Sequence, residues 1–196
     1  MTVDLQAQVL ARFVAINGDH PMTPADDKYV NSQFVPLTDL PVDADQIRAD
    51  MLASRLPMPS YVRSDGVEMV PADLLALAER AGGVHDLPEW FRAQGWPDAA
   101  TAEDEWRGYL SGRYVCLKSV TPTTMQRKDS LMTAIGDAKR DPRPDSPEWR
   151  STLHALVDEL DALEPTFTAY DRLRFGGPVS RDTHIDDVRA AYPRSL

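Results

Sequence analysis

LPMPSYVRSDGVEMV (Leu56–Val70) interrupts a chain that otherwise shows the residue spacing of amphipathic helices. Pro57 and Pro59 disfavour helix at its start, and two short alternating runs then flank residues 64–66. Asp-Gly between alternating runs predicts a β-hairpin, because glycine adopts the positive φ that a tight turn needs. We therefore expect one short hairpin near residues 60–70. Because a lone hairpin is only marginally stable, it must pack against helices.

Helix-start signals recur on both sides of this stretch. The expected N-cap residues are Thr23, Asp43, Thr101, Thr121 and Ser146. Three of them precede a proline, which is favoured at the first helical position. Apolar residues with a 3.6-residue period mark the last of these helices most clearly. The expected fold class is mainly α, a single helical domain over residues 1–196 with a hairpin insert.

Composition narrows the partners that this chain can have. Of its 196 residues, 42% are apolar and 27% are charged, as in globular proteins, and the formal net charge is −10. An acidic balance argues against nucleic acid and against an anionic membrane surface. No apolar run approaches the roughly 20 residues of a membrane span, and the N-terminus lacks the basic start of a secretory signal. The one cysteine, Cys116, fits a reducing compartment, so we expect a cytoplasmic location.

Motifs for metal or nucleotide chemistry are absent from the sequence. There is no His-Glu-x-x-His, no paired-cysteine spacing, no phosphate loop and no Gly-x-Gly-x-x-Gly. His184 with Asp186 and Asp187 has the residue types of a metal site, but a solvated helix start explains the same residues. We therefore expect no metal and no cofactor.

With metal and nucleotide chemistry excluded, the remaining class of function is acid–base chemistry on an organic substrate. Glu89 is the main candidate residue for it. Glu89 lies between Pro88 and the aromatic pair Trp90-Phe91. An apolar setting disfavours a charged carboxylate and raises its pKa, which suits a proton shuttle. The alternative is an ordinary first-turn glutamate favoured by the helix dipole. His85, four residues earlier, can assist a proton transfer or can be a loop histidine.

The hairpin and the aromatic residues supply candidate substrate-binding groups. Arg63 can clamp a substrate carboxylate through two hydrogen bonds, or it can be a surface arginine on an edge strand. Tyr61 adds an aromatic side chain to the same insert. Trp90 belongs to a group of tryptophans that suit a flat ring substrate, although large aromatic residues also build ordinary cores.

A third candidate lies at the start of the helix that follows Thr121. Thr124 and Arg127 have the residue types of an anion site at a helix N-terminus. Capping fully explains Thr121, so only these two residues are left for a binding role.

Three stretches suggest a relationship with known proteins. LPxPSYVRSDGxxMV, LSGRYVCLKSVTP and RFGGPVSRDTHIDDVRAAYP together resemble a family of small actinobacterial proteins of uncharacterised domain type, found among natural-product biosynthesis genes. The chain is also similar in size to Pictet–Spengler enzymes that build β-carbolines from tryptophan. In those enzymes, too, a hairpin arginine precedes a catalytic glutamate.

The resemblance implies a cofactor-free enzyme that condenses an aromatic amine with an aldehyde, and it implies a homodimer. Glu89 would remove the ring proton after cyclisation, and Arg63 would hold the carboxylate of the amino acid. A second reading is a non-catalytic helical binding or partner protein within a biosynthetic pathway. The two readings differ in whether Arg63 and Glu89 converge on one enclosed pocket.

Overall fold

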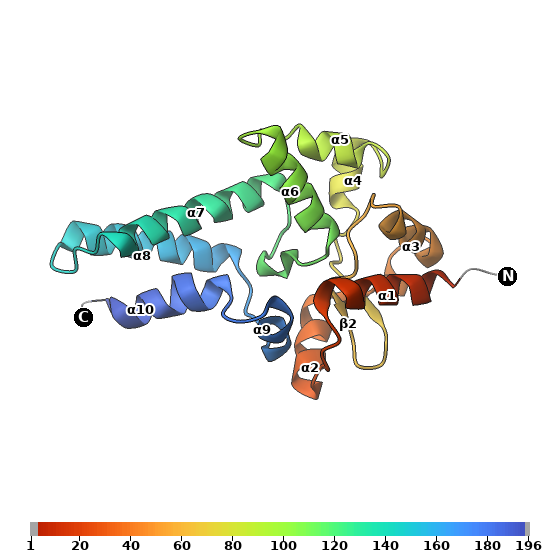
Figure 1. Ribbon diagram of the computed structural model, residues 1–196, viewed down its shortest axis with the longest axis horizontal. Helices are drawn as coiled ribbons and strands as arrows, with labels where there is room; N and C mark the ends of the chain where they lie inside the picture. Colours follow the sequence, from red (N-terminus) through yellow and green to blue (C-terminus); the bar gives the residue numbers. More distant parts are fainter. Residues whose placement is uncertain (1–3, 195–196) are drawn as a thin grey trace. The chain divides into compact units, whose positions relative to one another are not determined.

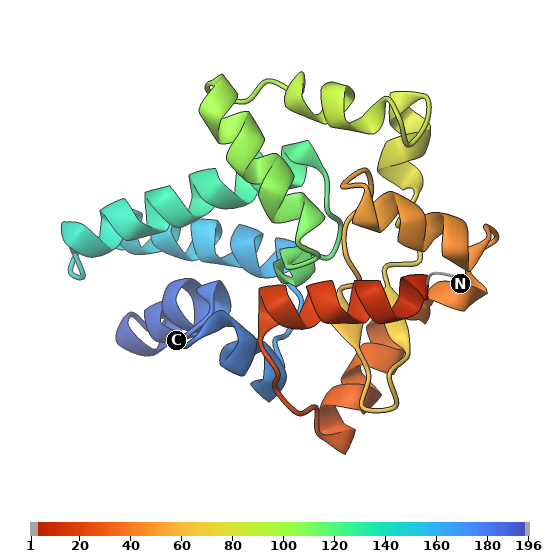
Figure 2. The same cartoon turned by 45° about the vertical axis from the view of Figure 1, so that its right-hand side comes forward.

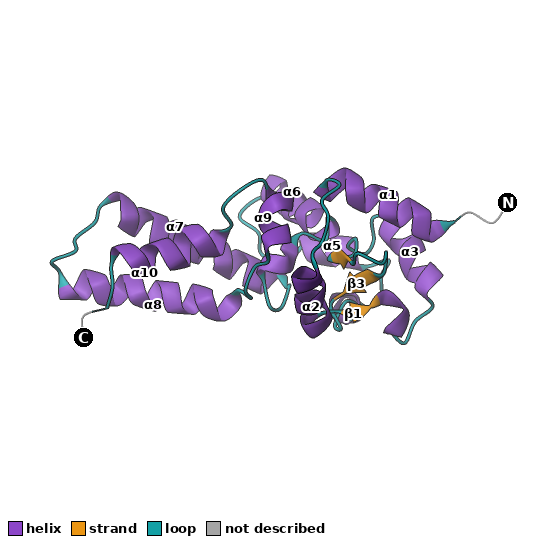
Figure 3. Cartoon of the chain, turned by 90° about the horizontal axis from the view of Figure 1, so that it is seen from below, coloured by secondary structure: helices purple, strands orange, loops and turns teal. Residues whose placement is uncertain are grey.

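The computed structural model describes residues 4–194, and within them the chain is mainly helical, as the sequence predicted. Figures 1 and 3 show short strands among many helices. The helices are α1 (Leu5–Asn17), α2 (Pro24–Gln33), α3 (Ala44–Leu52), α4 (Ala76–Ala81), α5 (Leu87–Arg92), α6 (Ala99–Leu110), α7 (Pro122–Arg140), α8 (Pro147–Leu163), α9 (Ala169–Phe175) and α10 (Asp187–Ala191). None of these helices is both long and apolar enough to cross a membrane.

Two compact units make up the chain. The first unit contains the chain up to Val115 together with Thr168–Arg174, and the second contains Cys116–Phe167 and the chain from Phe175 onward. The sequence-based assignment of a single domain stays a prediction.

The expected hairpin is confirmed and lies in the first unit. Strand β2 (Tyr61–Val62) pairs antiparallel with β3 (Glu68–Val70), and Gly66 in the turn between them has a φ of +83°. A third strand, β1 (Val35–Pro36), pairs with the other side of β3, which is therefore the central strand. The sequence did not predict β1, because two residues beside a proline carry no strand pattern. As an edge strand, β1 tolerates that proline.

A buried ion pair fixes the central strand to α3. The Arg48 guanidinium donates hydrogen bonds to the Glu68 carboxylate from Nε at 3.0 Å and from Nη2 at 2.5 Å. Both side chains are buried, and Arg48 also pairs with Asp45 at 2.8 Å. Together these carboxylates raise the pKa of Arg48. Polar groups, as well as apolar burial, therefore hold the hairpin in place.

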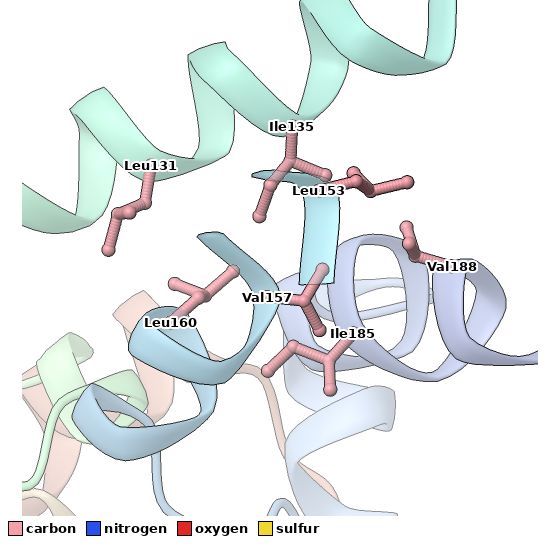
Figure 4. Close-up of a cluster of buried hydrophobic side chains, with 7 residues drawn as sticks. All are labelled: Leu131, Ile135, Leu153, Val157, Leu160, Ile185 and Val188. Carbon is pink, nitrogen blue, oxygen red and sulfur yellow. The ribbon is translucent and has the colours of Figure 1, made fainter. Parts of the chain in front are cut away.

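The second unit has its own aliphatic core. Helices α7 and α8 pack against α10 and the π-helical turn that precedes it, Asp182–Asp186. Figure 4 shows the core side chains, which are Leu131, Ile135, Leu153, Val157, Leu160, Ile185 and Val188. The α7–α8 loop falls at residues 141–146, which include Pro142 and Pro144, and prolines so close together disfavour helix.

One predicted helix start is wrong, and helix α9 was not predicted. Helix α6 starts at Ala99, because Asp98 is the N-cap and accepts a hydrogen bond from the backbone N–H of Thr101 at 2.8 Å. Thr101 is therefore a first-turn residue. The helix before the Gly82-Gly83 pair, α4, begins at Ala76, after the turn residues 72–75.

Candidate functional site

Arg63 lies beside the hairpin turn, and neighbouring side chains engage its guanidinium group. Two of its nitrogens donate to the Asp65 carboxylate, at 3.0 Å from Nε and 2.5 Å from Nη2. The remaining terminal nitrogen donates to the side-chain oxygen of Asn31 at 2.8 Å. The hydrogen bonds that Arg63 donates to the Asp65 carboxylate raise the pKa of Arg63. The two-pronged carboxylate contact expected from a substrate is thus made to a residue two positions along the chain.

Tyr61, the aromatic residue of the hairpin, is buried, and its hydroxyl donates to Asp171 Oδ1 at 3.0 Å. The Arg174 guanidinium lies 4.4 Å from the Tyr61 ring centre and donates to Asp171 at 2.9 Å. Burial raises the pKa of the Tyr61 hydroxyl. We call Tyr61, Asp171 and Arg174 the hairpin anchor, because they join β2 to α9 across more than one hundred residues of sequence.

His85 and Glu89 are both exposed to solvent at the start of α5. Glu89 occupies the first turn, where a carboxylate interacts favourably with the helix dipole. Trp90 is half-buried, whereas Phe91 is fully buried and stacks on Trp96 and on aromatic rings of α6. The aromatic residues near Glu89 therefore include a packed core cluster of the first unit.

The hairpin turn and α5 lie at opposite ends of the first unit. Figures 1 and 2 both show α5 at the top and the turn between β2 and β3 at the bottom. The structure therefore does not bring Arg63 and Glu89 together. Among the described residues, no three His, Cys, Asp or Glu side chains are grouped in a way that would hold a metal ion.

Thr124 and Arg127 lie at the start of α7 in the second unit. The Thr124 hydroxyl accepts from the backbone N–H of Thr121 at 3.0 Å and completes a capping box with that residue. Arg127 is exposed and donates to both carboxylate oxygens of Glu159, each at 2.5 Å. The contacts of both residues are therefore those of a helix cap and of a surface ion pair.

A buried polar cluster in the second unit was not predicted. Its centre is the Glu164 carboxylate, which receives the Lys128 ammonium at 2.7 Å and the Ser180 hydroxyl at 2.5 Å on the same oxygen. Lys128 Nζ also donates to Ser180 Oγ at 3.0 Å, and Lys128 and the thiol of Cys116 influence each other's pKa. We call these four residues the Lys128 cluster.

In the Lys128 cluster, neighbouring groups outweigh the effect of burial on the pKa of the lysine. Burial alone lowers the pKa of an ammonium group, but the pKa of Lys128 is raised because Cys116 and Glu164 favour its charged form. Burial raises the pKa of the Cys116 thiol against the pull of Lys128. The second oxygen of Glu164, Oε2, is buried and has no hydrogen-bond partner among the described residues.

His184 borders this cluster from the π-helical turn, a rare backbone form that often occurs at functional sites. Burial lowers its pKa, and Thr183 Oγ1 lies 2.8 Å from Nδ1. It is half-buried, so the expectation of a solvated helix start does not describe it. Sequence patterns gave no signal for the cluster, because its members are spread from position 116 to position 180.

One comparison with known proteins gives a match. Residues 92–193, just over half of the chain, match a family described as "Family of unknown function (DUF6058)". No curated protein and no solved structure matches the chain. The matched range contains the whole Lys128 cluster, whereas Tyr61, Arg63 and Glu89 precede it.

Proposed function

The chain belongs to the DUF6058 family, whose function is unknown, and we propose that it is a non-catalytic helical partner protein in a natural-product biosynthetic pathway. The observation that supports this proposal is the separation of Arg63 from Glu89 within the first unit. A carboxylate clamp and a proton shuttle act on the same substrate molecule, and a general base must come within hydrogen-bonding reach of the proton that it removes. Groups at opposite ends of a unit do not meet this requirement.

The local contacts of the candidate residues support the same proposal. Arg63 is engaged by Asp65 and Asn31, so binding a substrate carboxylate would first require breaking these hydrogen bonds. Glu89 is exposed, and an exposed carboxylate lacks the water-excluding surroundings that strengthen electrostatic catalysis. The natural-product setting itself rests on the sequence resemblance.

Charge indicates what kind of partner this protein binds. Its formal net charge is −10, so a partner with a basic surface would be attracted to it over distances of about a Debye length. The partner that we propose is an enzyme of the same pathway with a basic surface, in the cytoplasm. The homodimer implied by the resemblance stays a prediction, which sedimentation of the purified chain would test.

Turnover and binding assays together test this function. The purified protein and its Glu89→Gln and Arg63→Lys variants are incubated with tryptophan-like amines and aldehydes, and products are followed by mass spectrometry. We expect all three proteins to give the same product yield as a protein-free control. Calorimetric titration with basic enzymes encoded beside this chain should show binding that weakens as salt is raised.

A different result would favour the Pictet–Spengler enzyme. Replacing a general base typically lowers the rate about 10²- to 10⁴-fold. Turnover by the parent protein that falls by such a factor in Glu89→Gln, with substrate affinity weakened in Arg63→Lys, would contradict our proposal and establish acid–base catalysis.

A further inference from the structure

The Ser180 hydroxyl lies between a buried carboxylate and a buried ammonium group. Its Oγ donates to Glu164 Oε1 at 2.5 Å and accepts from Lys128 Nζ at 3.0 Å. Lys128 also contacts the same oxygen of Glu164 at 2.7 Å, so each of the three polar groups touches the other two. A hydroxyl within hydrogen-bonding reach of a base, with the base oriented by a third group, is the arrangement that activates a serine nucleophile.

The three side chains differ in their access to solvent. Those of Lys128 and Glu164 are only 8% and 0% exposed, whereas Ser180 is half-buried. A small reagent can therefore approach the serine from solution, while water is largely excluded from the two charged groups behind it. Interactions between charges are stronger where water is excluded, so both groups act strongly on the serine oxygen.

The two charged groups have different roles toward the hydroxyl. Burial alone would lower the pKa of Lys128, but Cys116 and Glu164 raise it, so Lys128 is an ammonium group at neutral pH. It can donate to the serine oxygen but cannot take a proton from it. The Glu164 carboxylate already accepts the hydroxyl hydrogen, and its other oxygen, Oε2, is buried without a hydrogen-bond partner among the described residues. Glu164 is therefore the group that can remove the proton of Ser180.

The backbone at Ser180 supplies donors for a carbonyl oxygen. Helical backbone runs over residues 180–191, and its first turn closes where the N–H of Thr183 donates to the Val179 carbonyl at 3.2 Å. The N–H groups of residues 180 and 181 precede that bond and have no acceptor within the helix. N–H groups at a helix start stabilise negative charge, including the charge that develops on a carbonyl oxygen during acyl transfer.

We propose that Ser180 is a nucleophile that accepts an acyl group from an activated ester. The site is a covalent modification site, and its co-substrate is a small acyl group bound to a good leaving group, as in an aryl ester or a thioester. This inference goes beyond the partner-protein function and does not depend on it, because it concerns the second unit and requires a single acylation rather than turnover.

The reaction transfers one acyl group and needs no oxidant or reductant. Glu164 takes the hydroxyl proton while Ser180 Oγ forms a bond to the acyl carbon, and the carbonyl electron pair moves onto the carbonyl oxygen. When that pair returns, the bond to the leaving group breaks, and the leaving group departs with its electrons as an aryloxide or a thiolate. The product is an ester on Ser180, and Glu164 releases its proton to water.

Acylation by p-nitrophenyl acetate, followed by peptide mass spectrometry, tests the proposal. We expect the folded parent chain to carry an acetyl group on Ser180, and Ser180→Ala to lack it. Exposed lysines also react with this reagent, so the peptide map decides the result rather than the intact mass. Glu164→Gln keeps the shape of the side chain but cannot take up a proton, so its Ser180 should acylate about 10²- to 10⁴-fold more slowly.

Two comparisons need no variant and stay decisive if Glu164→Gln misfolds. Ser130 is a matched control in the same chain, because it is exposed on α7 and donates only to the Gln126 carbonyl of its own helix, at 3.0 Å. Ser130 should stay unlabelled under conditions that label Ser180, and concentrated urea should abolish the difference. An unlabelled Ser180 in the folded parent, equal labelling of the two serines, or labelling of folded Glu164→Gln at the parental rate would overturn the proposal.

Discussion

Replacing Gly112 with alanine should destabilise the first unit, and the structure supplies a matched control for this substitution. Gly112 and Gly95 both have a φ of +72°, so alanine meets the same backbone strain at each position. They differ in their surroundings. A Cβ on Gly112 would lie 2.5 Å from the Met58 carbonyl oxygen and 2.7 Å from that of Pro59, whereas a Cβ on Gly95 would meet nothing within 4 Å.

The expected magnitudes follow from these two contributions. A left-handed conformation costs an alanine about 1–2 kcal/mol, which is the whole effect expected for Gly95→Ala. Forcing an atom into backbone that cannot move freely adds about 1–3 kcal/mol at Gly112. The backbone there is held, because the N–H of Met58 donates to the Leu110 carbonyl at 2.9 Å. Gly112→Ala should therefore lose about 2–5 kcal/mol of unfolding free energy.

Urea denaturation followed by tryptophan fluorescence measures this difference. Trp90, Trp96 and Trp106 belong to the first unit and Trp149 to the second, so a Trp149→Phe background restricts the signal to the first unit. Unfolding midpoints that are equal for the two alanine variants, with equal slopes, would refute the reasoning from close approach. They would mean that backbone strain alone explains both losses.

Three further predictions concern buried charged groups. Asp171→Ala should cost about 3–5 kcal/mol, because it removes the carboxylate that forms a buried ion pair with Arg174. Exposed Asp145→Ala should leave the urea midpoint unchanged, and equal midpoints for the two variants would count against the anchor. Lys128→Met alone should also lower the free energy of unfolding by about 3–5 kcal/mol, because it leaves the buried Glu164 carboxylate without its cation. Adding Glu164→Leu should restore most of this loss. A double variant with no recovery would show that the ionic contacts themselves are needed. For His184, burial lowers the pKa in the folded state below the unfolded value of about 6.5. As the pH falls through about 6.5, the unfolded state therefore binds a proton before the folded state does. The free energy of unfolding then decreases until the pH reaches the lowered pKa of the folded state. The parent should therefore lose more unfolding free energy between pH 7 and pH 5 than His184→Gln does, and identical losses would contradict this sign.

Local rules predicted most of the secondary structure. Thr23, Thr121 and Ser146 cap α2, α7 and α8 as their side chains and following prolines indicated. The hairpin was predictable for the same reason, because its turn depends on one glycine and on neighbouring residues. Strand β1 was not, because its pairing with β3 joins residues that are about 35 positions apart.

The candidate site was harder to predict, because the sequence shows the residue type but not the partner. Arg63 has the group that binds a carboxylate, but the carboxylate that it contacts belongs to Asp65. Tyr61 was proposed as a substrate-binding aromatic residue, but it is buried, and its hydroxyl bonds to Asp171 of α9, 110 residues away. Thr124 likewise pairs with Thr121 three positions earlier, and Arg127 pairs with Glu159 on α8.

The location of the family match adds a reason to study the second unit first. The range 92–193 includes the Lys128 cluster and two members of the hairpin anchor, but it excludes every residue proposed for Pictet–Spengler chemistry except Thr124 and Arg127. A buried lysine–glutamate pair is often no more stabilising than apolar residues of the same volume, so stability alone is a weak reason for it. One carboxylate oxygen of this pair, Glu164 Oε2, is buried without a hydrogen-bond partner among the described residues, which adds to the cost of keeping the pair.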